Sequence, residues 1–207
     1  MTTLLQINAS IFGADGVSSQ LSDQFVAGWQ AANPADRVIT RDLARDTPPH
    51  LTAERFTGFS TASDQRTTAQ QEAVAYSDAL IAELGAAQLL VLGLPMYNFG
   101  LPTQFKAWFD HVARAGVTFN YTAQGPRGAF PQLRAVVFAS RGGTYADTAN
   151  DLEVAHLKQL LGLIGITDVH VVFAEGMARA GRDARMATAR EEVAAAVEAA
   201  SLARDVA

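Results

Sequence analysis

The sequence predicts a doubly wound α/β domain, in which a five-stranded parallel sheet carries helices on both faces. Five short aliphatic segments alternate with segments of helical periodicity, and this alternation is typical of successive β–α–β units. The last three of these segments, 89–94, 135–139 and 169–173, are mainly aliphatic along their whole length, as expected of strands buried on both faces. With 207 residues and no repeat or linker, the chain is expected to form one domain over residues 1–207.

Each expected element follows from its own pattern. Strands are expected at 4–8, 38–42, 89–94, 135–139 and 169–173. Helices, where apolar residues recur three or four positions apart, are expected at 18–32, 64–84, from Pro102 to about 114, 151–163 and 185–203. Pro102 suits the first turn of its helix. Residues 117–128 are expected to form a small hairpin, whereas 43–63 has no clear periodicity and is expected to be irregular.

Composition excludes several classes of function. The formal net charge is -5 and no Lys and Arg cluster occurs, so nucleic acid is not an expected partner. There is no cysteine, so any redox function needs a cofactor, and no His or Asp spacing typical of a metal site is found. No signal peptide and no apolar stretch approaching ~20 residues is found, so no membrane association and a cytoplasmic location are expected.

Doubly wound folds bind ligands beyond the carboxyl ends of their strands. The loop after the first strand, NASIFGADGVSSQL, combines glycines with hydroxyl side chains at the start of a helix. Ser10, Gly16, Val17 and Ser18 are the candidates to hold a phosphate, because glycine allows close approach and a helix N-terminus presents free N–H groups. Alternatively, Ser18 or Ser19 merely caps the helix. The loop matches neither GxGxxG nor GxxxxGK[ST], so neither of those nucleotide sites is expected.

The loop after the third strand carries large side chains between glycines and prolines. Met96, Tyr97, Asn98 and Phe99 follow one another there. Such side chains can pack on a flat heterocycle while loop N–H and C=O groups bind its polar edge. The alternative is a loop that folds its aromatic residues into its own core.

The loop after the fourth strand, Ser140 to Gly143, allows close approach of the backbone through Gly142 and Gly143. Arg141 either places positive charge near an anionic ring or is an exposed surface residue. The three loops lie at the ligand-binding end of the fold. A phosphate site beside a platform for a flat ring is what a mononucleotide requires, and FMN fits best.

These residues resemble a known family, the FMN-dependent NADH azoreductases, which are flavodoxin-like quinone and azo-dye reductases. The stretch MYNF followed by LPTQFKAWFDHV is highly specific, whereas SRGG alone is not. The resemblance covers nearly the whole chain and rests on PMYNF (95–99), ARAGVTFNYT (113–122), SRGG (140–143), GLIGITDV (162–169) and FAEG (173–176).

The resemblance implies roles for the loop residues. Ser10 and the turn Gly16–Ser18 would bind the FMN phosphate, Met96 to Phe99 would hold the isoalloxazine ring, and Ser140 to Gly143 would border its other side. Gly16 and Val17 replace residues that are often polar in the family, so only their backbone N–H groups can contribute there.

The resemblance also implies a homodimer with its active site at the interface. Phe56, Phe59, Tyr121 and Tyr145 are then expected to line the substrate pocket, with Tyr145 tuning substrate choice. The alternatives are that Phe56 and Phe59 belong to a mobile surface loop and that Tyr121 is a core aromatic of the hairpin.

The family mechanism is ping-pong: NADH or NADPH passes hydride to flavin N5 and leaves, and a quinone, azo compound or nitroaromatic then takes its place. No side chain is expected to act as an obligatory acid or base, so no catalytic residue is assigned. A flavodoxin-type FMN electron carrier, without small-molecule turnover, is the alternative function. A serine hydrolase is disfavoured because no GxSxG motif is present.

Overall fold

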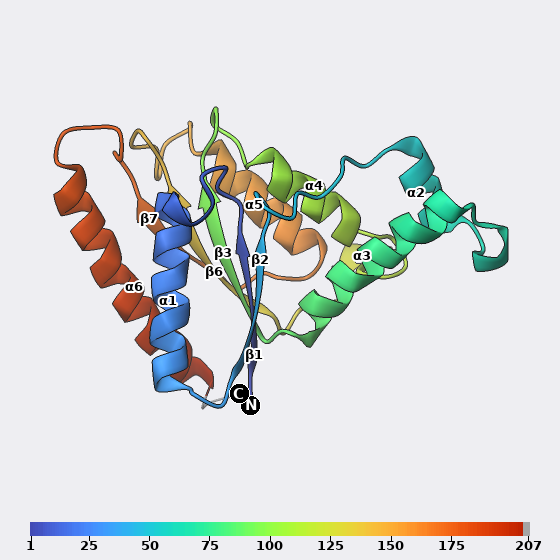
Figure 1. Ribbon diagram of the computed structural model, residues 1–207, viewed down its shortest axis with the longest axis horizontal. Helices are drawn as coiled ribbons and strands as arrows, with labels where there is room; N and C mark the ends of the chain where they lie inside the picture. The colour runs from blue at the N-terminus through green and yellow to red at the C-terminus, as the bar shows by residue number, and fades with distance from the viewer. Residues whose placement is uncertain (205–207) are drawn as a thin grey trace.

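One parallel sheet organises the protein, and the computed structural model describes it through residues 1–204 (Figure 1). Its strand order is β2-β1-β3-β6-β7, and every neighbouring pair is parallel. This is the predicted five-stranded, doubly wound sheet. The strands are β1 (Thr3–Asn8), β2 (Arg37–Asp42), β3 (Leu89–Pro95), β6 (Arg134–Ser140) and β7 (Val169–Ala174).

Helices cover both faces of the sheet, as predicted (Figure 1). One face carries α1 (Val17–Ala32) and α6 (Arg182–Arg204), which pack against each other. The other carries α3 (Thr68–Ala86), α4 (Thr103–Val112) and α5 (Leu152–Leu163). Among the helices of residues 1–204, none has the length and apolar character needed to cross a bilayer.

The all-aliphatic strands separate two hydrophobic cores. Successive side chains of a strand point to opposite faces. Leu90 and Leu92 of β3 therefore join the core beneath α3, α4 and α5. Leu89 and Val91 join the core beneath α1 and α6. A strand that serves two cores shows no polar alternation, and this explains the continuous aliphatic pattern of its sequence.

The structure differs from the sequence-based boundaries in the segment after β2. The segment 43–63, expected to be irregular, includes the helix α2 (Ala53–Ser60), whose first turn is capped by the Thr52 hydroxyl. The short helix η2 (Ser63–Gln65) lies where the next helix was expected to begin. The next helix starts at Thr68 rather than at 64, because Thr67 forms a capping box with Gln70.

The remaining short elements lie near the predicted positions. The predicted hairpin is present as β4 (Phe119–Thr122) and β5 (Gly125–Gly128), which pair antiparallel. A short helix, η1 (Gly13–Asp15), precedes α1. Because all five strands are parallel, the loops after β1, β3 and β6 gather at one edge of the sheet, the upper edge in Figure 1.

Candidate functional site

A cleft of about 180 Å³ opens where the loops after β1, β3 and β6 meet. Most of the residues predicted to bind a cofactor line it, and Ser18, Asn98, Phe99 and Gly143 lie outside its lining. Its lining residues are Ser10, Phe12, Gly16, Val17, Pro95, Met96, Tyr97, Ser140, Arg141, Gly142 and Met177. The topology thus brings together three loops that are distant in the sequence.

A larger cavity, of about 250 Å³, lies near the opposite ends of the strands, between the start of β6 and the last turns of α6. Arg134, His170 and Ala200 are among its lining residues, and none of the predicted site residues is. Since doubly wound folds bind ligands at the carboxyl ends of their strands, the smaller cleft is the candidate site.

The first turn of α1 forms the β1 side of the site. Its N-cap is Gly16, which provides no side-chain cap, so neither Ser18 nor Ser19 caps the helix and that alternative is wrong. Within residues 1–204, the backbone N–H groups of Val17, Ser18 and Ser19 have no acceptor, and the buried Ser18 and Ser19 hydroxyls have no partner. Unpaired donors at a helix N-terminus, which carries partial positive charge, suit an anion such as a phosphate monoester.

Two glycines allow this turn to lie close to its neighbours. A Cβ at Gly16 would overlap the Ser10 hydroxyl, which itself accepts a hydrogen bond from the Phe12 N–H (3.2 Å). A Cβ at Gly93 in β3 would overlap the side-chain oxygen of Asn8 and lie 3.0 Å from the carbonyl oxygen of Ser18. Both positions therefore need glycine if α1 is to start directly above the sheet.

The loop after β3 closes into a tight turn. The N–H of Tyr97 donates to the carbonyl of Gly100 and the N–H of Gly100 to that of Tyr97, both at 3.0 Å. Between them, Asn98 and Phe99 have positive φ angles of 49° and 65°. Asn tolerates this region, but Phe adopts it rarely, at a cost of roughly 1–3 kcal/mol.

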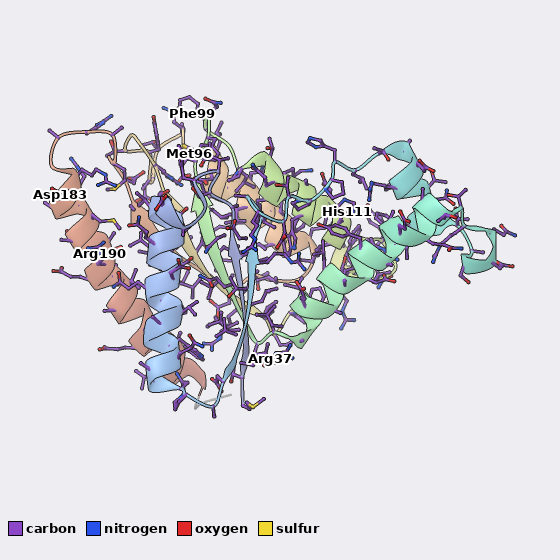
Figure 2. The ribbon with its side chains drawn as sticks, viewed as in Figure 1. Arg37, Met96, Phe99, His111, Asp183 and Arg190 are labelled. Carbon is purple, nitrogen blue, oxygen red and sulfur yellow. The ribbon has the colours of Figure 1, made fainter. Side chains whose placement is uncertain are left out.

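This turn holds its large side chains outward rather than in a core. Asn98 is exposed, and Phe99 is 48% exposed at the tip of the loop (Figure 2). The Tyr97 hydroxyl accepts a hydrogen bond from the Ile11 N–H (3.1 Å), and the Met96 N–H donates to the Ser140 carbonyl (2.9 Å). The alternative of a loop packed into its own core is therefore wrong for Asn98 and Phe99, and the loop links the β1 and β6 sides of the cleft.

The structure places Arg141 differently from either of the two sequence-based interpretations, a charge beside an anionic ring or an exposed surface residue. It is buried, not exposed, and its guanidinium pairs with Asp151 (2.7 Å), Glu175 (3.2 Å) and Glu153 (3.3 Å). The guanidinium also lies over the ring of Phe173, 4.7 Å from its centroid. The positive charge expected beside an anionic ring is therefore taken up by three carboxylates, although Arg141 is among the residues that line the cleft.

This buried cluster shifts two pKa values. Burial raises the pKa of Glu153 to about 8, although Arg141 acts in the opposite direction. Burial alone would lower the pKa of Arg141, but its carboxylate partners outweigh burial and the pKa is raised. Burial thus favours the protonated form of Glu153.

Of the four predicted pocket residues, only Tyr145 lies beside the cleft in this chain. Its ring contacts the ring of Phe99 edge-on, with centroids 5.5 Å apart, and its hydroxyl lies over Gly143. Phe59 packs instead against Arg114 and His111. Phe56 is 64% and Tyr121 78% exposed, so Tyr121 is not a core aromatic of the hairpin.

Sequence reasoning missed three lining residues, Phe12, Pro95 and Met177, and the partners of Arg141. Phe12 lies in the loop after β1, and Met177 follows the FAEG stretch at the end of β7. Because ligand sites lie at strand ends, the position of Met177 just after the last strand was the available signal. Nothing in the sequence distinguishes Asp151, Glu153 and Glu175 from surface carboxylates.

The fold and the cleft define a flavodoxin-like protein. The family model described as "Flavodoxin-like fold" matches residues 2–197, and the chain belongs to this family. An azoreductase from Bacillus anthracis str. Sterne superposes with a TM-score of 0.87 at 27% identity, covering 95% of this chain and 99% of that one. An FMN-dependent NADH-azoreductase from Bacillus anthracis str. Ames Ancestor, solved in complex with FMN, has a TM-score of 0.88 at 22% identity and shares the fold.

Curated relatives narrow the family further. The FMN-dependent NADH:quinone oxidoreductase of Cellvibrio japonicus is 45% identical over 93% of this chain and 97% of its own length. FMN-dependent NADH:quinone oxidoreductase 6 of Burkholderia lata is 47% identical over 95% of this chain and 100% of its own length. The chain therefore belongs to the family of FMN-dependent NADH:quinone oxidoreductases.

Proposed function

We propose that this chain is an FMN-dependent oxidoreductase that transfers hydride from NADH or NADPH to quinones and to aromatic azo compounds. One observation carries the proposal: the donor-rich start of α1 and the outward aromatic turn 96–99 border a single cleft. Membership in the family of NADH:quinone oxidoreductases supports the activity, and the resemblance to the azoreductases supports azo compounds as substrates.

The described residues fit FMN. The phosphate would lie in the turn Gly16–Ser18 beside Ser10, where the N–H groups of Val17 and Ser18 and the Ser18 hydroxyl have no partner among the described residues. The ring would lie between the turn 96–99 and residues 140–143. Bound FMN would supply the hydride exchange. The nicotinamide donor and the acceptor would bind one after the other at the same position beside the ring.

The chain itself binds and orients the cofactor and the substrates, and no side chain is assigned to proton transfer. The lining of the cleft holds no Asp, Glu, His or Lys, and the guanidinium of Arg141 is paired with carboxylates. Water therefore supplies the protons. Cleaving an azo bond to two amines takes two rounds, each with one nicotinamide as reductant.

A homodimer completes the site in this proposal. Phe56 and Tyr121 are exposed aromatic side chains that this chain leaves uncovered, and exposed apolar surface of this kind favours a protein interface. We place them, with Phe59, at the walls of the pocket of a dimer. A cytoplasmic location accords with NADH as the donor.

A visible spectrum of the purified protein, before and after anaerobic addition of NADH, tests the proposal. Flavin bands that bleach with NADH and return with benzoquinone support an oxidoreductase. Flavin bands that NADH leaves unchanged would instead favour the electron carrier. Failure of added FMN to bind would contradict the assignment of the cleft.

A further inference from the structure

The carboxylate of Glu175, the residue after β7, holds the loop that follows β6. Its Oε1 accepts hydrogen bonds from the backbone N–H groups of Tyr145 (2.6 Å) and Ala146 (2.9 Å). The same oxygen accepts from Nη1 of Arg141 at 3.2 Å. Hydrogen bonds to a charged acceptor are roughly twice as strong as neutral ones, so three donors converge on one strong anchor.

Backbone hydrogen bonds from the two residues after Glu175 join the same two loops. The N–H of Gly176 donates to the carbonyl of Gly143 at 2.7 Å, and the N–H of Met177 to that of Arg141 at 3.0 Å. The loop after β6 is therefore fixed to the end of β7 by both backbone and side-chain contacts.

Arg141 helps to fix the position of the Glu175 carboxylate. Its side chain is fully buried, and Asp151 and Glu153 hold the other nitrogens of the guanidinium while the Phe173 ring covers its face. Since the guanidinium has a fixed place, the carboxylate of Glu175 has one too.

The loop anchored in this way carries the ring that meets Phe99. Tyr145 contacts Phe99 edge-on, and this contact joins the loop after β6 to the strained turn after β3. Both loops contribute lining residues to the cleft, among them Met96 and Gly142. The position of the Tyr145–Phe99 pair thus depends on the carboxylate of Glu175.

We propose that Glu175 is a positioning residue that fixes the Tyr145–Phe99 pair as a wall of the acceptor slot and thereby limits which aromatic acceptors enter. The effect on acceptors rests on the proposed function, whereas the hydrogen bonds of Glu175 to the loop after β6 are given by the structure alone. Glu175 touches no reacting atom in this arrangement and acts through Tyr145.

The variant E175Q keeps the size of the side chain and removes its charge. In flavin-free protein, amide hydrogen exchange at Tyr145 and Ala146 is expected to rise about tenfold, because a neutral amide oxygen replaces the charged acceptor and weakens both hydrogen bonds. In the FMN-loaded enzyme, the ratio of kcat/KM for methyl red to that for benzoquinone is expected to rise by about threefold or more, through KM for the dye.

The variant D151N is the matched control. It removes another carboxylate partner of Arg141 but none of the acceptors of the Tyr145 and Ala146 amides. Amide exchange at these two residues and the ratio of the two acceptors are expected to change much less than in E175Q, because both amides keep their charged acceptor. Equal effects of D151N and E175Q would overturn the specific role of Glu175.

A double variant tests whether Glu175 acts through Tyr145. Once Y145A has removed the ring, E175Q is expected to change the acceptor ratio no further. A full E175Q effect in the Y145A background, or unchanged amide exchange in E175Q, refutes the inference. If E175Q does not fold, E175D serves, since a shortened carboxylate keeps the charge and lengthens the same contacts.

The exchange measurement uses flavin-free protein, so it reports on the anchor even if FMN fails to bind. If wild-type protein shows no NADH-dependent turnover, the proposed function and the role of Glu175 in acceptor choice are both contradicted. If amide exchange still rises in E175Q, Glu175 nevertheless holds the loop after β6. Wild-type turnover with an unchanged acceptor ratio in E175Q would contradict only the positioning role.

Discussion

At the scale of a single residue, Gly16 determines the geometry of the cleft on the side where we propose that the phosphate binds. A methyl group there would overlap the Ser10 hydroxyl, which already holds the N–H of Phe12. The sequence suggested that glycine allows a ligand to approach, and the structure adds that Ser10 itself occupies the space of a side chain. Any larger residue has to move either Ser10 or the turn that presents the N–H groups of α1.

The variant G16A is expected to weaken FMN binding by about tenfold or more and to cost roughly 1–3 kcal/mol of stability, because the added methyl group has no space. Titration of flavin-free protein with FMN and urea unfolding measure both effects. G162A is the control: Gly162 lies within α5 with no atom near its Cβ position, so alanine there is expected to stabilise the protein by about 0.5–1 kcal/mol. Unchanged FMN affinity in G16A would contradict the phosphate site.

Glu153 is expected to make stability depend on pH. Its pKa is about 8 in the folded protein against an ordinary 4.5, so the folded state binds the proton more tightly. Its contribution is therefore complete below pH 4.5 and is lost as the pH rises to about 8, at about 1.4 kcal/mol for each unit of pKa difference.

The variant E153Q, which resembles the protonated acid, is expected to unfold with a free energy that falls much less between pH 5 and pH 8. Urea unfolding across this range measures it, with E72Q at an exposed position of α3 as the control. A wild-type slope in E153Q would show that another group carries the dependence.

At the scale of elements, long and strongly patterned segments could be predicted, and short ones defined by contacts could not. The central strands β3 and β6 were the most predictable, because each contributes side chains to both cores and is apolar along nearly its whole length. The helix α2 was not, since it has eight residues and only Gly58 of them is buried. Similarly, the position of Arg141 on the chain was predictable, but its acidic partners come from the start of α5 and from the residue after β7, and only the fold brings them together.

Arg66 holds α2 against the rest of the protein. Its Nε donates to the carbonyls of Gly58 (3.1 Å) and Thr61 (3.0 Å), at the end of that helix. R66A is expected to cost roughly 1 kcal/mol and to speed proteolytic cleavage within 53–62, because two backbone acceptors lose their donor. R45A, at an exposed position after β2, is the control. Equal cleavage of both variants would contradict the role of Arg66.

At the scale of the whole molecule, the exposed aromatic residues distinguish this chain from a self-contained carrier. Phe56 lies on α2 and Tyr121 on β4, on elements that are additions to the five-stranded fold. An apolar side chain this exposed gains from burial against a partner. The two added elements are therefore where we expect the second subunit to contact this one.

The double variant F56D/Y121D is expected to weaken the proposed dimer by about tenfold or more, because each change places a charge in an apolar contact. Light scattering coupled to size exclusion over a dilution series measures this. L202D, at an exposed apolar position of α6, is the control that is expected to keep the dimer. Coincident dissociation curves for wild type and F56D/Y121D would refute the contact.

The unpaired N–H groups of α1 also bear on how this protein is handled at the bench. Simple oxyanions such as inorganic phosphate and sulfate can occupy the same donors, and ligands that bind only the folded state raise its stability by mass action. Flavin-free protein is thus expected to melt at a higher temperature in phosphate buffer than in Tris at equal ionic strength. The choice of buffer then sets the apparent FMN affinity and the flavin content that survives purification.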